Sequence, residues 1–209
     1  AVKAGAGGVL MLPPFYYKDP SDDGLFAYYS EIIQQIGDER LRVYLYHFPQ
    51  MSAIPISYSL IERLLKDYPL TVVGMKDSSG DLDNMASAAK EFPGFAVLSG
   101  QDNLLLPQLQ AGGTGCITAC ANVGSELAAA VYEGFKDDED VHAVNQVLVA
   151  LRKTVSRFPL SAHSRNSAWR KRLRPKSAAA SSTPSRKTSN TRRSWPPSVT
   201  FVSIHPKSR

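Results

Sequence analysis

Lys76 closes an apolar run, 71–76, and is the residue in this sequence with the most evident chemical potential. Burial at the end of a strand disfavours the charged ammonium form of a lysine. A neutral amine can attack a ketone to form an imine, which then withdraws electrons from the adjacent carbon atom. Two plainer interpretations remain open here: the side chain could extend to the surface, or it could pair with Asp77.

Tyr46 ends the preceding apolar run, 43–46. Neighbouring parallel strands lie ~4.8 Å apart, so a tyrosine and a lysine at adjacent strand ends can meet. A phenol in that position can pass protons to and from the carbinolamine that precedes an imine. The alternative is a tyrosine packed in the core with its hydroxyl group on a backbone carbonyl. His47 should point away from Tyr46, and we expect it to have a packing role.

The elements that must position these residues are predicted from apolar periodicity. Short apolar runs indicate strands buried on both faces, as in a parallel sheet, at 9–12, 43–46, 71–75, 96–98 and 116–119. Apolar residues at helical spacing predict helices over 25–36, 59–68, 82–92, 104–110, 123–135 and 142–158. Ser57 and Asp81 stand where helices should begin, and Gly37 and Gly112 where helices should end.

Two α/β architectures fit this alternation. An open, doubly wound sheet usually has a glycine-rich phosphate turn after its first strand, whereas prolines and aromatic residues follow here at 13–17. A (β/α)₈ TIM barrel places functional side chains at the carboxyl ends of its strands. Tyr16, Tyr46, Lys76 and Ser99 stand at such ends. We therefore predict an incomplete TIM barrel, with about strands four to eight present and about three strands preceding residue 1.

Five segments resemble the dihydrodipicolinate synthase / N-acetylneuraminate lyase family in order and spacing, and together they extend the resemblance over roughly residues 1–158. They are residues 8–17, 44–49, 73–81, 98–102 and 111–122. The resemblance implies a (β/α)₈ barrel in which Lys76 forms an imine with pyruvate and Tyr46 relays protons. Tyr16 looks like the tyrosine that completes the relay, with Tyr17 as the alternative.

The same resemblance implies that Gly100 and Ile117 line the pyruvate pocket through their backbone. It also implies a homotetramer that needs no metal and no organic cofactor, because the imine itself activates the substrate. The family's Gly-Thr-Thr-Gly-type segment, which binds the pyruvate carboxylate, would lie before residue 1. Dihydrodipicolinate synthases carry an arginine where this sequence has 49–53, which contain none, so a sugar acid or other 2-keto-3-deoxy acid is at least as well supported as aspartate semialdehyde.

Charge and composition divide the sequence at about residue 158. All 19 Asp and Glu residues lie in the first 160 positions, whereas half of the 24 Lys and Arg residues follow them. We expect 1–158 to be the lyase domain and 159–209 to be a basic, serine-rich, disordered tail. A reading-frame change near residue 159 would explain the abrupt shift; a natural tail and a nucleic-acid-binding arm are the alternatives, with few aromatic residues for the latter.

The remaining features predict the compartment and the absence of other sites. No apolar run approaches the ~18–20 residues of a membrane span. Cys116 and Cys120 are expected to be small core residues and not metal ligands, and two cysteines favour the cytoplasm. The predicted function is a Schiff-base-forming class I lyase or aldolase acting on pyruvate or a related 2-keto acid. The alternatives are an inactive barrel fragment and a non-enzymatic protein with a basic nucleic-acid-binding tail.

Overall fold

Five parallel strands form one sheet in a computed structural model that describes residues 1–158. Their order in the sheet follows the chain: β1 (Val9–Met11), β2 (Val43–His47), β3 (Val72–Asp77), β4 (Ala96–Ser99) and β5 (Gly115–Cys116). Every neighbouring pair is parallel, so each connection must cross over the sheet. The predicted partial (β/α) barrel is confirmed, whereas the predictions for 159–209 concern residues outside the described range.

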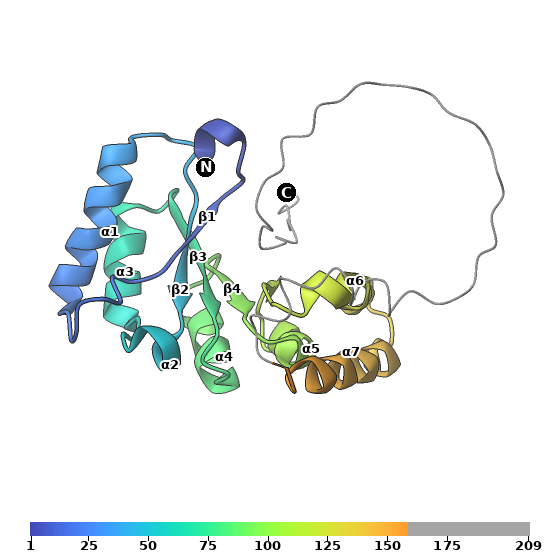
Figure 1. Cartoon of the computed structure of the whole chain (residues 1–209). Coiled ribbons are helices and arrows are strands. Elements are labelled where there is room, and N and C mark those ends of the chain that lie inside the picture. The colour runs from blue at the N-terminus through green and yellow to red at the C-terminus, as the bar shows by residue number, and fades with distance from the viewer. Residues whose placement is uncertain (159–209) are drawn as a thin grey trace, which may run out of the picture.

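Helices make these crossovers and continue beyond the last strand. They are α1 (Asp22–Ile36), α2 (Pro49–Ser52), α3 (Tyr58–Asp67), α4 (Leu82–Glu91), α5 (Leu105–Gln110), α6 (Ala121–Lys136) and α7 (His142–Val155), with 3-10 turns η1 (Val2–Ala4) and η2 (Asp102–Leu104). Figure 1 shows α1 and α3 side by side along one part of the sheet, and α5, α6 and α7 gathered at the other end. No helix in this described part combines the length and apolarity that crossing a bilayer requires.

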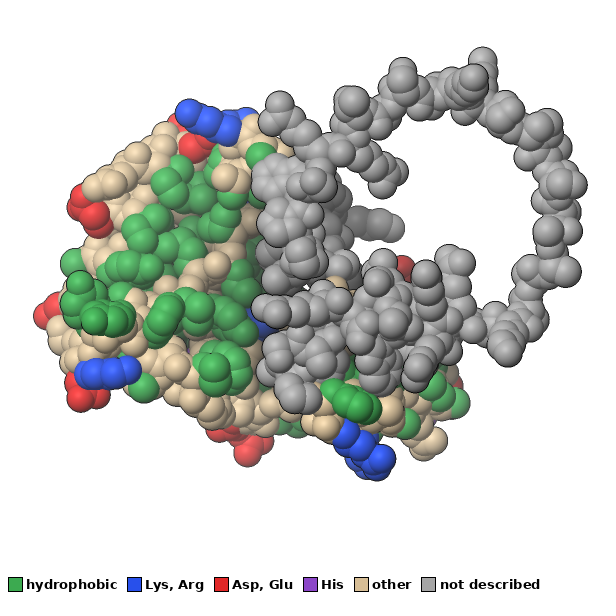
Figure 2. Space-filling model, viewed as in Figure 1, with side chains coloured by type: hydrophobic (Ala, Val, Ile, Leu, Met, Phe, Trp, Pro, Cys, Tyr) green, Lys and Arg blue, Asp and Glu red, His purple; other side chains and the backbone are tan. Residues whose placement is uncertain are grey.

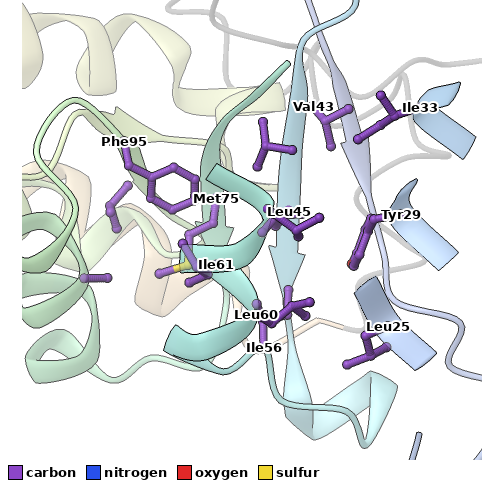
Figure 3. Close-up of a cluster of buried hydrophobic side chains, with 14 of the residues drawn as sticks. Leu25, Tyr29, Ile33, Val43, Leu45, Ile56, Leu60, Ile61, Met75 and Phe95 are labelled. Carbon is purple, nitrogen blue, oxygen red and sulfur yellow. The ribbon is translucent and has the colours of Figure 1, made fainter. Parts of the chain in front are cut away.

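The main core lies between the sheet and the helices α1, α3 and α4 (Figure 3). Leu25, Tyr29 and Ile33 recur at helical spacing along α1 and are buried against β2. In β2 the alternate residues Val43 and Leu45 are fully buried on this side. Each such aliphatic side chain stabilises the fold by roughly 1.5–3 kcal/mol. The intervening residues of β2 consequently face the other side of the sheet, where the barrel interior lies.

Helix ends follow the sequence prediction closely. The side chains of Ser57 and Asp81 accept hydrogen bonds from backbone N–H groups in the first turns of α3 and α4. Gly37 ends α1 with φ 55°, and Gly112 follows α5 with φ 91°, both in the left-handed region that favours glycine. Ser21, which the sequence analysis did not single out, caps α1 in the same way.

The fifth strand is shorter than the predicted 116–119. It comprises Gly115–Cys116 alone, although the Ile117 N–H still donates to the Ser99 carbonyl at 2.9 Å. Beyond that point the Thr118 hydroxyl group turns to the buried Asp102 carboxylate, and the chain enters α6. A side-chain hydrogen bond across 16 residues therefore ends the strand before its apolar run is finished.

Among residues 1–158 both edges of the sheet are open, as in a partial barrel. In this range β1 pairs with β2 alone and β5 with β4 alone. Figure 2 shows a broad area of hydrophobic side chains on the face that carries the N-terminal part of the chain. Three exposed aromatic residues, Phe15, Tyr16 and Tyr17, lie in the segment after β1.

Candidate active site

Strand register brings Lys76 and Tyr46 together. β2 and β3 pair so that Tyr46 lies opposite Lys76, after an irregularity between Val43 and Tyr44 that shifts the register by one residue. Lys76 Nζ donates a hydrogen bond to the Tyr46 hydroxyl group at 3.0 Å. The same nitrogen atom lies 4.2 Å from the centroid of the Tyr46 ring. The predicted proximity of amine and phenol is thus present in the structure, at the carboxyl ends of two adjacent strands.

Both side chains are held in place by their surroundings. Lys76 is 9% exposed, so most of the residue is enclosed. The Tyr46 ring stacks on Phe48 with a centroid separation of 5.8 Å and an interplanar angle of 22°. Within residues 1–158 Lys76 forms no ion pair, and its neighbour Asp77 points to the opposite face of the strand. Neither of the plainer interpretations of Lys76, surface extension or pairing with Asp77, describes the structure.

Gly100 and Ile117 lie at the ends of the next two strands. The Gly100 N–H donates to the Asp77 carbonyl at 2.6 Å, and the Ile117 N–H donates to the Ser99 carbonyl at 2.9 Å. These bonds extend the sheet by one residue at each strand and occupy both N–H groups. That the backbone of Gly100 and Ile117 lines a pyruvate pocket stays a prediction.

Gly100 has no room for a side chain. A Cβ atom there would lie 2.0 Å from the Ser78 hydroxyl oxygen and 2.8 Å from the Ser78 Cα atom. The β3–α4 segment and the β4–η2 segment consequently approach each other more closely than any other residue type at position 100 would allow.

Asp77 is a buried anchor that the sequence analysis did not single out as functional. It is 0% exposed, and its carboxylate accepts hydrogen bonds from the Ser79 N–H at 2.7 Å, the Ser79 hydroxyl at 2.5 Å and the Asn84 amide at 2.7 Å. The spacing Asp-x-Ser directly after the lysine was the available signal, because such residues form tight turns at strand ends. Asp77 thereby fixes the end of the strand that carries Lys76.

His47 occupies the buried side of β2, as predicted from its place after Tyr46. The Ile56 N–H donates to His47 Nδ1 at 3.2 Å, so this nitrogen is unprotonated. Burial lowers the pKa of His47, while the nearby Asp77 and Asp81 carboxylates partly oppose that effect. The imidazole therefore has a packing and hydrogen-bonding role on the face away from the amine.

Tyr16 is not brought to the Lys76–Tyr46 pair within this chain. It is 84% exposed, and its ring contacts Tyr17 edge-on at a centroid distance of 5.8 Å. Tyr17, the alternative, is 69% exposed. The relay role assigned to either tyrosine remains a prediction, which would need this loop to move or to approach a second subunit.

The two cysteines are buried and unbonded to each other, as expected of small core residues. Burial raises the pKa of the Cys116 thiol to about 12 and that of Cys120 to about 11, and the Asp102 carboxylate adds to both effects. Within residues 1–158 no group of three or more His, Cys, Asp or Glu side chains is arranged to hold a metal ion.

The chain is similar in sequence to known proteins. The chain is 34% identical over 156 residues to an uncharacterized DapA-like lyase of Chloroflexus aurantiacus, covering 75% of this chain and 52% of that protein. It is also 34% identical over 158 residues to the 4-hydroxy-tetrahydrodipicolinate synthase of Methanopyrus kandleri, covering 74% and 51%. The chain thus spans about half the length of these curated relatives.

Solved structures and a family profile agree with these relatives. A putative dihydrodipicolinate synthase from Thermus thermophilus matches with a TM-score of 0.70 and 26% identity, over 82% of this chain and 58% of that one. YagE from E. coli K12, solved in complex with pyruvate, matches with a TM-score of 0.64 and 25% identity, over 71% and 50%. The profile of the dihydrodipicolinate synthetase family matches residues 1–163, and the chain belongs to that family.

Proposed function

We propose that Lys76 is the nucleophile of a class I lyase or aldolase and that it forms a Schiff base with pyruvate or a related 2-keto acid. The observation that carries this proposal is the 3.0 Å hydrogen bond between the amine of an enclosed lysine and a phenol at the carboxyl end of a parallel sheet. Support comes from the family membership and from the pyruvate bound to the similar YagE.

The proposed chemistry uses groups of this chain. The lone pair of the Lys76 amine attacks the carbonyl carbon of the keto acid, and a nitrogen–carbon bond forms. The carbonyl oxygen becomes a hydroxyl group as it takes a proton, which the Tyr46 hydroxyl is placed to deliver, while the nitrogen gives up a proton in exchange. The hydroxyl group then takes a second proton from the Tyr46 hydroxyl and leaves as water, while the nitrogen lone pair forms the C=N bond, so that a protonated imine and the Tyr46 phenolate remain. The reaction needs no metal and no organic cofactor, because the protonated imine withdraws electrons from the adjacent carbon.

The proposal extends to the compartment and the oligomeric state of the protein. We propose a cytoplasmic enzyme that assembles as a homotetramer. The free thiols of Cys116 and Cys120 suit a reducing compartment. The exposed aromatic side chains of Phe15, Tyr16 and Tyr17 form the kind of surface that is covered in oligomers. The chain covers about half of its relatives, so its activity by itself is part of what must be tested.

Reductive trapping tests the proposal. The protein is incubated with pyruvate and borohydride, and its intact mass is measured. We expect one reduced pyruvate per chain in the wild type and none in Lys76→Ala. Lys90→Ala, which removes a lysine from the last turn of α4, is the matched control and should trap pyruvate like the wild type. If the wild-type protein acquires no adduct, the proposal fails, and the alternative that the chain is an inactive barrel fragment stands.

A further inference from the structure

A second pair of polar residues lies directly behind Lys76 and Tyr46. In the register of β2 and β3, Tyr46 lies opposite Lys76, and the residues that follow them, His47 and Asp77, lie opposite each other. Successive side chains of a strand point to opposite faces, so His47 and Asp77 share the face away from the amine. Both are buried, His47 to 8% exposure and Asp77 completely. We call His47 and Asp77 the rear pair.

Backbone hydrogen bonding ties the two strand ends together at this level. The Ser78 N–H donates to the His47 carbonyl oxygen at 2.8 Å, so the residue after the rear pair on β3 is bonded to the rear pair on β2. The hydrogen bond between Lys76 and Tyr46 spans the same two strands one residue earlier. Its length therefore depends on how the two strand ends are held.

The side chains of the rear pair are held by different elements. His47 Nδ1 accepts a hydrogen bond from the Ile56 N–H at 3.2 Å, in the connection that leads to α3. The Asp77 carboxylate accepts hydrogen bonds from Ser79 and from the Asn84 amide in the first turn of α4. The strand end that carries Tyr46 is thus fixed from the α3 side, and the strand end that carries Lys76 is fixed from α4.

The charged groups around His47 are acidic. Asp77 faces it from β3 and Asp81 from the start of α4, and both carboxylates act on it electrostatically. Burial, together with the charges of Asp77, Asp81 and Glu91, raises the pKa of Tyr58 on α3, so this group is a neutral hydroxyl near neutral pH. Within residues 1–158 no lysine or arginine forms an ion pair with any of these carboxylates. A protonated His47 would therefore be drawn towards Asp77.

Protonation of His47 would loosen both anchors at once. An imidazolium carries a hydrogen atom on each ring nitrogen, so Nδ1 and the Ile56 N–H would face each other as two donors and their hydrogen bond would be lost. The new positive charge would also compete with Ser79 and Asn84 for the oxygen atoms of Asp77. Both strand ends would then shift. Reaction rates are sensitive to such shifts, because a displacement of about 1 Å can cost about 10²-fold.

We propose that the rear pair positions Lys76 and Tyr46 from the opposite face of the sheet, and that protonation of His47 releases this support. The inference rests on the proposed function of Lys76. Neither member of the rear pair touches the substrate, and each acts through the strand end that it fixes. Imine formation is therefore fastest while His47 is neutral. As the pH falls and His47 takes a proton, the reaction slows beyond the slowing that protonation of the Lys76 amine causes.

The pH dependence of imine trapping tests this inference on the full chain. Trapping of pyruvate by cyanoborohydride, which reduces imines in mildly acidic solution, is measured from about pH 8 to about pH 5, on both sides of the ordinary histidine pKa. Circular dichroism at each pH gives the folded fraction, to which the trapping rate is referred. The ratio of wild-type and variant rates cancels the protonation of Lys76, which is common to both proteins.

His47→Asn keeps an acceptor for the Ile56 N–H and does not titrate. We expect it to trap pyruvate within about twofold of the wild-type rate at about pH 8 and about 10-fold faster than the wild type at about pH 5. His142→Asn, at an exposed site at the start of α7, is the matched control and should follow the wild type at every pH. His47→Ala removes the acceptor and should trap about 10-fold more slowly than His47→Asn at about pH 8.

Asp77→Asn supplies the second arm, because it removes the charge that favours the imidazolium. In this background the pH at which the rates with His47 and with His47→Asn diverge should fall by about one unit. Parallel pH profiles of the wild type and His47→Asn, or a divergence that Asp77→Asn leaves unmoved, would overturn the inference and leave the role of Lys76 intact. Absence of trapping in the wild type at every pH would instead remove the proposed function, and the inference with it.

Discussion

Lys76 Nζ and the Tyr46 hydroxyl group are joined by a 3.0 Å hydrogen bond across two parallel strands, and the amine also lies 4.2 Å from the centre of the tyrosine ring. The two contacts have different chemical consequences. The hydroxyl group can exchange protons with the nitrogen, whereas the ring stabilises a cation through its electron-rich face. Removing the hydroxyl group alone would separate these two contributions.

Tyr46→Phe should therefore keep the ring contact and lose the proton relay. We expect the rate of pyruvate trapping by borohydride to fall by about 10²- to 10⁴-fold, as for the loss of a general acid–base group. Tyr44→Phe, which removes a hydroxyl group two residues earlier in β2, is the matched control and should trap at the wild-type rate. Equal trapping rates in both variants would show that the phenol is not the relay.

Gly100→Ala should destabilise the protein by about 1–3 kcal/mol, the usual cost of forcing extra atoms into a packed site. The new methyl group would lie 2.8 Å from the Ser78 Cα atom, which is backbone and cannot turn away. Urea unfolding measures the change. Gly7→Ala is the control, because a Cβ atom at Gly7 meets nothing within 4 Å. A Gly100→Ala variant as stable as Gly7→Ala would contradict the close approach of the two strand ends.

Asp77→Asn should lower the free energy of unfolding by about 1–3 kcal/mol. All the groups that contact the Asp77 carboxylate are donors, so one end of an asparagine amide would place an N–H group against another donor. Asp83→Asn, in the first turn of α4, is the control. Trapping measured on the same samples would report whether the displaced strand end also moves Lys76. Unchanged stability would mean that Asp77 does not anchor β3.

His47 should make stability depend on pH. Burial holds its pKa below the ordinary 6.5, so the unfolded chain binds a proton more readily than the folded chain does. Stability contributed by neutral His47 is therefore complete above about pH 6.5 and is lost as the pH falls from there towards the lower folded pKa. Protonation of Nδ1 would also remove the hydrogen bond from the Ile56 N–H.

Urea unfolding at about pH 7.5 and about pH 5.5, on either side of the ordinary histidine pKa, checks this dependence on three proteins. His47→Asn retains an acceptor without titrating, and we expect it to lose less stability between the two pH values than the wild type. His142→Asn, at an exposed site at the start of α7, should behave like the wild type. Identical losses in His47→Asn and the wild type would refute the role of the buried imidazole.

The apolar periodicity of the sequence predicted the strands and the contact between Lys76 and Tyr46, because both depend on patterns within short stretches of the chain. Apolar runs mark buried strands, and parallel strands end at one edge of the sheet, so residues at the ends of consecutive runs converge. Helix caps such as Ser57 could be predicted for the same reason, since a capping side chain bonds only to the first turn of its own helix. These parts of the fold needed no knowledge of distant contacts.

The missed features depend on residues far apart in the chain. Asp102 and Arg152 form an ion pair across 50 residues, and no pattern near either one indicates the other. Thr118 shortens β5 through the same kind of long-range bond. The position of Tyr16 could not be predicted either, because the aromatic side chains of the loop after β1 are exposed, that of Tyr16 to 84%.

Peptide mapping after borohydride reduction with isotope-labelled pyruvate is the most direct test of the central claim that Lys76 is the imine-forming residue. Digestion of the trapped protein and fragmentation of its peptides would locate the reduced adduct on one side chain. The account predicts the label on the peptide that contains Lys76, and its loss from that peptide when excess unlabelled pyruvate competes. An adduct on any other lysine, with the Lys76 peptide unmodified, would contradict it.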